Sequence, residues 1–369
     1  MNRDARRIWI DDKARMAGFA DGDAFARRFN LRPYRLMQLY RAATRELLHD
    51  VAAVSVLPKE LRMEFASAGL QFDSISTIAI QHSRDAQTTK ALFALHDGAE
   101  VEAVLMEHFG DRNTVCISSQ AGCAYGCAFC ATGQGGFNRQ LSATEIFDQA
   151  RFFARTLAEK DERITNVVFM GMGEPFANYE AVMDAVALLN DAQGFGLGQR
   201  HITISTVGVV PKIDRFAEEA VQVNLAISLH APNDALRSEM MPVNRRWNLE
   251  QLLSACERYV AKTNRKVFFE YVMLKRINDS PLHAQELAAL MQGRLYHVNL
   301  IPYNATPDGH FGATPDAKIW EFAAILEAAG VPVTVRANMG RDIAAACGQL
   351  RVETQPKASE RNVTTIGAS

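Results

Sequence analysis

The chain has 369 residues, of which 48% are hydrophobic and 22% charged, and its formal net charge is -2. This composition is typical of a globular protein, and no run of about eighteen apolar residues is present that would span a membrane. The charged start MNRDARRIWIDDKARM lacks the apolar core of a signal peptide, so we expect a cytoplasmic protein. The near-zero charge neither supports nor excludes a nucleic-acid partner, because a basic binding face can be local.

Residues 1–75 are predicted to form a small helical accessory domain. The segment 31–48 places apolar residues at helical spacing with arginines between them, and Pro58 and Gly69 are placed to start and end a second helix. The arginines of the first segment are candidate contacts for RNA phosphates, although a solvated basic face explains them equally well. These candidates are Arg32, Arg35 and Arg41.

A β-rich connector is predicted at residues 76–113, where three short segments mix apolar and β-branched residues. From residue 114 to residue 350, short apolar runs alternate with longer amphipathic stretches, such as 179–192 and 248–263. The apolar runs are predicted to be buried strands, at 166–170, 201–206, 223–228, 267–273, 297–301 and 331–336.

The alternation of strands and helices predicts a parallel sheet with right-handed crossovers. About six strand–helix units over roughly 235 residues fit a complete or partial barrel better than an open dinucleotide-binding fold. The polar residues 351–369 are predicted to form a disordered tail. The sequence thus predicts an α/β protein in which the accessory domain and the connector precede a barrel at 114–350.

Three of the six cysteines lie within eight residues, in the run Cys123-x3-Cys127-x2-Cys130. In a cytoplasmic protein, clustered cysteines are more often metal ligands or catalysts than disulfides. Three thiolates leave one iron of a four-iron cluster with an open position, since such a cluster normally takes four. That iron could chelate the amino and carboxylate groups of a small molecule. A zinc site is the alternative, but zinc takes four ligands, commonly in two Cys-x2-Cys pairs, and no second pair is present.

This cysteine spacing resembles the signature of the radical S-adenosylmethionine (SAM) superfamily. The resemblance implies a partial (β/α)6 radical SAM barrel and a [4Fe-4S] cluster held by Cys123, Cys127 and Cys130. The glycine-rich turn from Gly171 to Pro175 follows a predicted strand, as does the superfamily's turn that meets the methionyl amino group. Its glycines let the backbone approach a ligand closely, and its glutamate can accept a hydrogen bond from an ammonium group.

Longer segments, from about Arg32 to Leu350, are similar to the RlmN/Cfr family; they include VCISSQAGCAYGCAFCATGQGGFNRQL, FMGMGEPFANY, LAISLHAPND and DIAAACGQL. The resemblance implies a radical SAM methyltransferase that acts on an adenine of 23S ribosomal RNA at the peptidyl-transferase centre. The RlmN branch methylates C2 and also acts on some transfer RNAs. The Cfr branch methylates C8, which gives antibiotic resistance.

The resemblance also implies catalytic roles for two further cysteines and one glutamate. Cys347 takes a methyl group from one SAM molecule, and a radical made from a second SAM removes hydrogen from that methyl. The methylene radical adds to the base, Cys116 resolves the RNA–protein link by forming a disulfide with Cys347, and Glu102 accepts the proton. Without the resemblance, each cysteine would be interpreted as a small buried hydrophobe, as we interpret Cys256, and Glu102 as a solvated surface group.

By the same resemblance, groups at or just beyond strand ends bind SAM, of which two molecules are used per turnover. Strand carboxyl ends form the active face of a barrel. The SAM-binding candidates are Gly173, Glu174, Ser205, Ser228, Leu229, His230 and Asn304. The expected partners are 23S ribosomal RNA, transfer RNA and an electron donor such as flavodoxin or ferredoxin. We expect a monomer without a membrane partner.

Some residues depart from the C2 branch. Met339 stands where C2 enzymes often carry an arginine, Ala344 where an acid is usual, and Ala305 rather than proline follows Asn304. These differences lean toward C8 methylation, whereas GMGEPFANY and ATGQGGFNRQ lean toward C2. We choose C2, the commoner housekeeping activity, and keep C8 as the alternative.

Two rival functions come from other classes. Another radical enzyme, such as an activase or a methylthiotransferase, is one; a methylthiotransferase should carry additional cluster cysteines, which are missing. The other is a catalytically silent RNA-binding protein on the same barrel. A silent relative would be expected to lose ligands, but all three ligands and both accessory cysteines are present.

Overall fold

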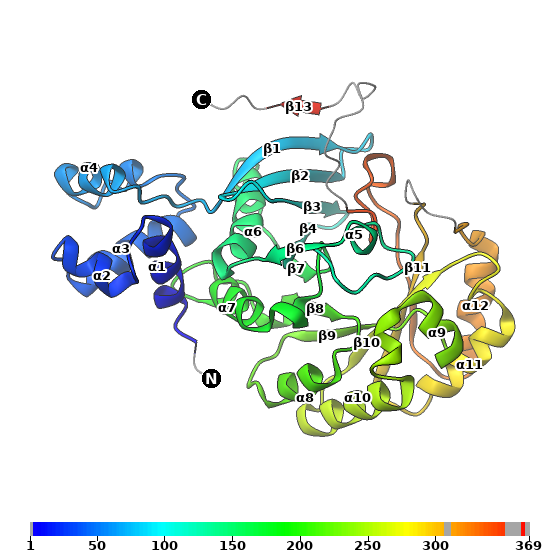
Figure 1. The fold of residues 1–369 in the computed structure, drawn as a ribbon. Coiled ribbons are helices and arrows are strands. Elements are labelled where there is room, and N and C mark those ends of the chain that lie inside the picture. The colour runs from blue at the N-terminus through cyan, green and yellow to red at the C-terminus, as the bar shows by residue number, and fades with distance from the viewer. Residues whose placement is uncertain (1–2, 306–310, 351–362, 366–369) are drawn as a thin grey trace.

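The computed structural model describes residues 3–305, 311–350 and 363–365. One 11-stranded mixed sheet organises them, in the order β12-β11-β10-β9-β8-β7-β4-β3-β2-β1-β13 (Figure 1). Its strands are β1 (Ile75–His82), β2 (Thr88–Leu95), β3 (Glu100–His108), β4 (Arg112–Cys116), β7 (Asn166–Phe169), β8 (Ile202–Thr206), β9 (Asn224–Ser228), β10 (Val267–Met273), β11 (Tyr296–Pro302), β12 (Val333–Val335) and β13 (Val363–Thr365). A separate two-stranded sheet joins β5 (Gln120–Gly122) and β6 (Phe137–Gln140).

The strands from β4 to β12 are parallel and follow one another in chain order, apart from the small β5–β6 sheet. They are largely apolar because helices cover them, as parallel sheets require. This arrangement confirms the predicted partial (β/α)6 radical SAM barrel. The helices on the outside of the curved sheet (Figure 1) are α6 (Ala143–Ala158), α7 (Tyr179–Asn190), α8 (Val210–Glu218), α10 (Leu249–Thr263), α11 (Pro281–Met291) and α12 (Asp316–Ala328).

The segment predicted as a connector continues the barrel sheet. Strands β1, β2 and β3 pair antiparallel, and β3 pairs antiparallel with β4. The register sets Val104 opposite Cys116 and Leu92 opposite Glu102. Opposed residues share a face, and side chains two apart on a strand do so too, so Glu102 and Cys116 lie on one face.

The predicted disordered tail at 351–369 lies mostly outside the described residues. Its part Val363–Thr365 forms β13, which pairs antiparallel with β1. At the other end of the chain, the segment predicted as an accessory domain contains four α-helices among its described residues, namely α1 (Ala5–Met16), α2 (Gly22–Arg28), α3 (Pro33–Thr44) and α4 (Lys59–Ser67). In the described parts of the chain, no helix is both long and apolar enough to cross a membrane.

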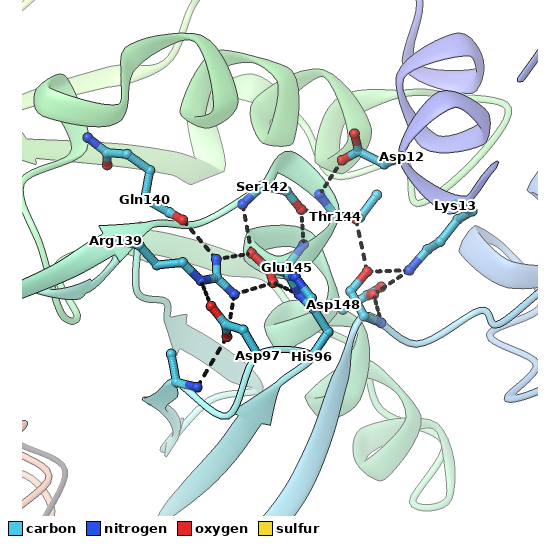
Figure 2. A network of polar contacts seen from close by, with 12 residues as sticks. Asp12, Lys13, His96, Asp97, Arg139, Gln140, Ser142, Thr144, Glu145 and Asp148 are labelled. Atoms are coloured by element: carbon cyan, nitrogen blue, oxygen red, sulfur yellow. Dashed lines mark hydrogen bonds and ion pairs between the residues drawn. The ribbon is translucent and has the colours of Figure 1, made fainter. Parts of the chain in front are cut away.

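A buried ion pair joins the N-terminal helices to the barrel. Trp9 of α1 packs in the hydrophobic core against the rings of Tyr40 and Phe72. From the same helix, the Lys13 ammonium lies 2.9 Å from an Asp148 carboxylate oxygen on α6, and both side chains are buried (Figure 2). Buried charges persist where they are paired, so this contact fixes α1 against the first barrel helix.

Candidate active site

The three clustered cysteines lie on the loop between β5 and the short helix α5 (Ala131–Gln134). The Cys123 N–H donates to the Gly136 carbonyl at 2.7 Å, and the Cys130 N–H donates to the Cys127 carbonyl at 3.1 Å. All three side chains line one cavity at the carboxyl ends of the barrel strands. The cluster motif therefore opens onto the active face of the barrel.

The chemistry of these thiols fits an iron–sulfur cluster. Burial raises the pKa of Cys123 to about 11 and raises the pKa of Cys127 well above its ordinary value, so both need a cation to become thiolates. Within the described ranges, no group of three or more Cys, His, Asp or Glu side chains converges to hold a single metal ion. A lone zinc requires its ligands around one centre, whereas the cysteines of a [4Fe-4S] cluster bind different irons.

The glycine-rich turn after β7 packs directly on the segment that follows β4. A Cβ on Gly171 would lie 2.7 Å from the backbone of Ile117, and one on Gly173, whose φ is +98°, would lie 2.5 Å from the Gln120 side chain. Only glycine fits such approaches without a shift. The turn is further held by the Glu174 N–H, which donates to the Gln120 side-chain oxygen at 2.7 Å.

The Glu174 carboxylate is held firmly at the edge of the cavity. One oxygen accepts from the Phe176 N–H at 2.9 Å and the other from the Val207 N–H at 2.8 Å. Burial raises the pKa of Glu174 to about 7, even though these donors favour the carboxylate. A cationic ligand in the cavity would stabilise the negative charge of Glu174, as expected for a carboxylate that binds an ammonium group.

Ser205, Ser228 and His230 line the same cavity. His230 has a φ of 61°, and its Nδ1 accepts from the Val272 N–H at 3.0 Å. Burial lowers the pKa of His230 to about 3, so the ring is neutral and its Nε2 carries the proton. Leu229 is fully buried in the core, and its backbone N–H donates to the Glu270 carbonyl at 3.1 Å.

A second cavity adjoins the first, and Cys347 lines both. Cys116 and Asn304 line the second cavity, so Asn304 is separated from the other SAM-binding candidates. The side-chain oxygen of Asn304 is buried with no hydrogen-bond partner among the described residues. Cys116 and Cys347 thus line the same second cavity, and neither cysteine forms a disulfide.

The loop that carries Cys347 is tied to the cluster segment. The Ala131 N–H donates to the Gly348 carbonyl at 2.8 Å, and the Thr132 hydroxyl donates to the Leu350 carbonyl at 2.5 Å. Ala131 directly follows the last cluster cysteine in the chain. These bonds place the candidate methyl carrier beside the candidate cluster.

Glu102 is buried rather than solvated. Its carboxylate lies 3.0 Å from the Lys90 ammonium, and both side chains are largely buried. Its backbone carbonyl accepts from the Ser118 hydroxyl at 2.6 Å. It shares the sheet face of Cys116, two positions along β3 from the residue opposite that cysteine. Cys256, by contrast, is fully buried in the core, as expected for a packing residue.

Two charged residues at the site were missed by the sequence analysis. Glu270 lies within the apolar strand β10 and lines the first cavity, while Arg336 lies just after β12 and lines the second. Arg336 Nη2 lies 3.2 Å from Glu270 Oε1, and its Nη1 lies 4.0 Å from the Cys347 sulfur. A charged residue inside an apolar strand was the available signal, because a buried charge needs a partner.

A polar network supports the hairpin that flanks the cluster loop (Figure 2). Arg139 of β6 donates to Asp97, between β2 and β3, at 3.1 Å and to Glu145 of α6 at 2.8 Å. Glu145 in turn accepts from the Ser142 N–H, while the Ser142 hydroxyl caps the helix in return. The network joins the hairpin to the sheet and to the start of α6.

Comparisons with known proteins agree with this geometry. The Radical SAM superfamily model matches residues 117–288. The probable dual-specificity RNA methyltransferase RlmN of Chloroflexus aurantiacus is 48% identical, over 86% of this chain and 86% of its own length. The ribosomal RNA large subunit methyltransferase N of Nitrosopumilus maritimus is 46% identical, over 87% of this chain and 93% of its own. A crystal structure of a radical SAM methyltransferase from Sphaerobacter thermophilus superposes with a TM-score of 0.87 at 48% identity, covering 90% of this chain and 97% of that chain.

Proposed function

Since the chain belongs to the RlmN family of radical SAM RNA methyltransferases, we propose that it methylates C2 of an adenine in 23S ribosomal RNA and in transfer RNA. One observation carries the proposal: the candidate methyl carrier Cys347 lines both the cavity of the cluster cysteines and the cavity of Cys116. A group at this junction reaches a cofactor on one side and a nucleobase on the other.

Each candidate residue has a part in this chemistry. C2 of adenine is electron-poor and not a nucleophile, so the bound [4Fe-4S] cluster and SAM supply radical chemistry instead. Cys123, Cys127 and Cys130 hold the cluster. Cys347 carries the methyl group, and Cys116 resolves the link to RNA by forming a disulfide with it. The proton acceptor is Glu102.

The SAM-binding candidates act through different groups. Glu174 accepts from the methionyl ammonium, and the neutral His230 ring offers its Nε2–H as a donor. The remaining candidates contribute hydroxyl, amide or backbone groups around the bound SAM. They are Gly173, Ser205, Ser228, Leu229 and Asn304. The position of Asn304 in the second cavity favours a contact with whatever part of the cofactor lies nearest Cys116.

RNA contact is assigned to the accessory domain, residues 1–75. A target adenine in folded RNA must leave its stack or be caught before the RNA folds. Of the candidate arginines, Arg32 and Arg41 are exposed and Arg35 is half-buried, but Arg35 donates to Gln38 and Arg41 to Gln193. Arg32 is therefore the best placed of the three for a phosphate.

The remaining partners follow from this chemistry. A one-electron donor such as flavodoxin or ferredoxin reduces the cluster. The enzyme acts as a monomer in the cytoplasm, where ribosomal and transfer RNA are found.

Mass spectrometry of nucleosides from 23S ribosomal RNA tests the proposal. RNA from cells that express the gene should contain 2-methyladenosine, and RNA from cells that lack it should not. A cluster-ligand variant, Cys127→Ala, is the matched control and should abolish the product. Finding 8-methyladenosine instead would establish the C8 alternative suggested by Met339 and Ala344, and an unchanged profile would contradict both activities.

A further inference from the structure

The guanidinium of Arg336 lies beside the sulfur atoms of Cys347 and Met170. Arg336 Nη1 is 4.0 Å from the Cys347 sulfur and 3.5 Å from the Met170 sulfur. Arg336 also lines the second cavity together with Cys116.

The Glu270 carboxylate, itself held by a hydrogen bond, orients the Arg336 guanidinium toward Cys347. Arg336 Nη2 lies 3.2 Å from Glu270 Oε1, which also accepts from the Asn299 side-chain amide at 2.9 Å. Glu270 is buried, and the Arg336 N–H donates to the Leu300 carbonyl at 2.9 Å. The ion pair with Glu270 uses only one end of the guanidinium fork, and the other end faces the cysteine.

We propose that Arg336 is a catalytic residue that stabilises the thiolate of Cys347 and so makes it the nucleophile of the first methyl transfer. The proposal rests on the proposed function. In this step the thiol proton leaves to solvent through the cavity, and the thiolate attacks the methyl carbon of a sulfonium donor. A carbon–sulfur bond to Cys347 forms, the bond between the methyl and the sulfonium sulfur breaks, and its electron pair stays on the neutral thioether that departs.

The surroundings of Cys347 make such a cation necessary. A thiolate, not a thiol, is the nucleophile. Cys347 is exposed to solvent at the cavity, yet desolvation by the protein packed around its sulfur raises the pKa of its thiol. Arg336 is the charge that opposes this effect, whereas Glu270 and Cys130 add to it. Because Glu270 is already neutralised by Arg336, the pair brings a cation to the sulfur without leaving an unpaired buried carboxylate.

The test measures alkylation of Cys347 by iodoacetamide, a neutral reagent that reacts with thiolates. Protein is purified without the cluster, checked by peptide mass for a free Cys347 thiol, and loaded with iron and sulfide under anaerobic conditions. Peptide mass spectrometry then follows modification of Cys347 over time from pH 6 to pH 10. Arg336→Met should slow the reaction at pH 7.5 by about tenfold or more and move its midpoint to higher pH, since one pKa unit is a factor of ten.

Three further variants separate charge from simple support. Arg336→Lys keeps the positive charge, so its rate of Cys347 alkylation should fall less than that of Arg336→Met. The lysine variant carries the test if the methionine variant does not fold. Glu270→Gln keeps the shape of the side chain and removes its negative charge, so the pH midpoint of Cys347 alkylation should stay the same or move to lower pH. Arg341→Met, an exposed arginine on the same loop, should react like the wild type.

The proposal fails if folded, iron-loaded Arg336→Met is alkylated at the wild-type rate. It also fails if Glu270→Gln slows the reaction as much as Arg336→Met does, because both would then act only as structural support. The assay contains no RNA. Either failure would therefore leave the proposed methylation of RNA to be decided by nucleoside mass spectrometry.

Discussion

At the scale of single residues, the position of Cys347 leads to a direct prediction. Transfer of a methyl group to this sulfur needs only attack by a thiolate on a bound donor. Protein isolated from cells should therefore carry a methyl group on the Cys347 peptide, detectable by mass spectrometry, and Cys347→Ala should carry none. A methyl group on Cys256, the buried core cysteine, would count against the mechanism.

Cys116 is predicted to be needed for release of the methylated RNA rather than for formation of the covalent link between RNA and Cys347. In Cys116→Ala, the methylene on Cys347 still adds to adenine, but no disulfide can form to free the product. The variant should trap an RNA–protein adduct that survives denaturation and disappears after ribonuclease digestion.

A matched control is Cys256→Ala. It should cost about 0.5–3 kcal/mol of stability, as is typical of point mutants, and leave turnover normal. Denaturing gels with and without ribonuclease read the result. A clean protein band with wild-type activity in Cys116→Ala would remove this residue from the mechanism.

At the scale of elements, the β5–β6 hairpin supports the cluster loop through Arg139. The hydrogen bond from Arg139 lowers the pKa of Asp97 to about 2, so the contact persists from neutral pH down to about pH 4 and is lost as the pH falls toward 2. Arg139→Ala should lower the free energy of unfolding by about 1–3 kcal/mol, because Glu145 would lose its charged donor.

The same variant should also retain less iron after purification, since the hairpin flanks the cysteine loop. Thermal unfolding and iron analysis measure the two effects. Arg200→Ala is the control, because the Arg200 side chain donates to an exposed glutamine, Gln222, and its loss should change neither value by much. Full iron content at a reduced melting temperature would show that the hairpin does not support the cluster.

The elements also show what the sequence could predict. Strand β10 was predicted with the bounds that it has, because a run that is apolar except for Glu270 marks a parallel strand buried on both faces. The cysteine spacing and the glycine-rich turn located one wall of the site. The pair Glu270–Arg336 was not predictable, because it joins β10 to the end of β12 across β11. The burial of Glu102 likewise depends on Lys90, a neighbour set by strand register.

At the scale of the whole molecule, docking of the accessory domain through Lys13 should control RNA use rather than cofactor chemistry. Lys13→Met leaves the buried Asp148 with Arg151 as its remaining cationic partner and the Ser74 N–H as a donor, so the loss should cost about 1–3 kcal/mol. If the loosened domain no longer presents RNA correctly, RNA methylation should fall while reductive cleavage of SAM continues.

Two assays on one sample measure this uncoupling: methyl transfer to RNA and formation of 5′-deoxyadenosine. Lys59→Met, an exposed lysine of the same domain, should leave the ratio of the two unchanged. An equal fall of both products in Lys13→Met would show that the contact supports the barrel itself. Equal and undiminished products would show that docking is not needed for RNA use.

The hydrogen bonds that tie the Cys347 loop to Ala131 and Thr132 give the enzyme an order of assembly. The loop of the methyl carrier is bonded to the segment after Cys130. We predict that this segment orders fully only when its neighbouring cysteines bind the cluster. Iron must therefore arrive before the methyl group. In a cell short of iron, the protein would therefore consume no SAM in methylating its own cysteine. Incubation of iron-free protein with SAM should leave Cys347 unmethylated.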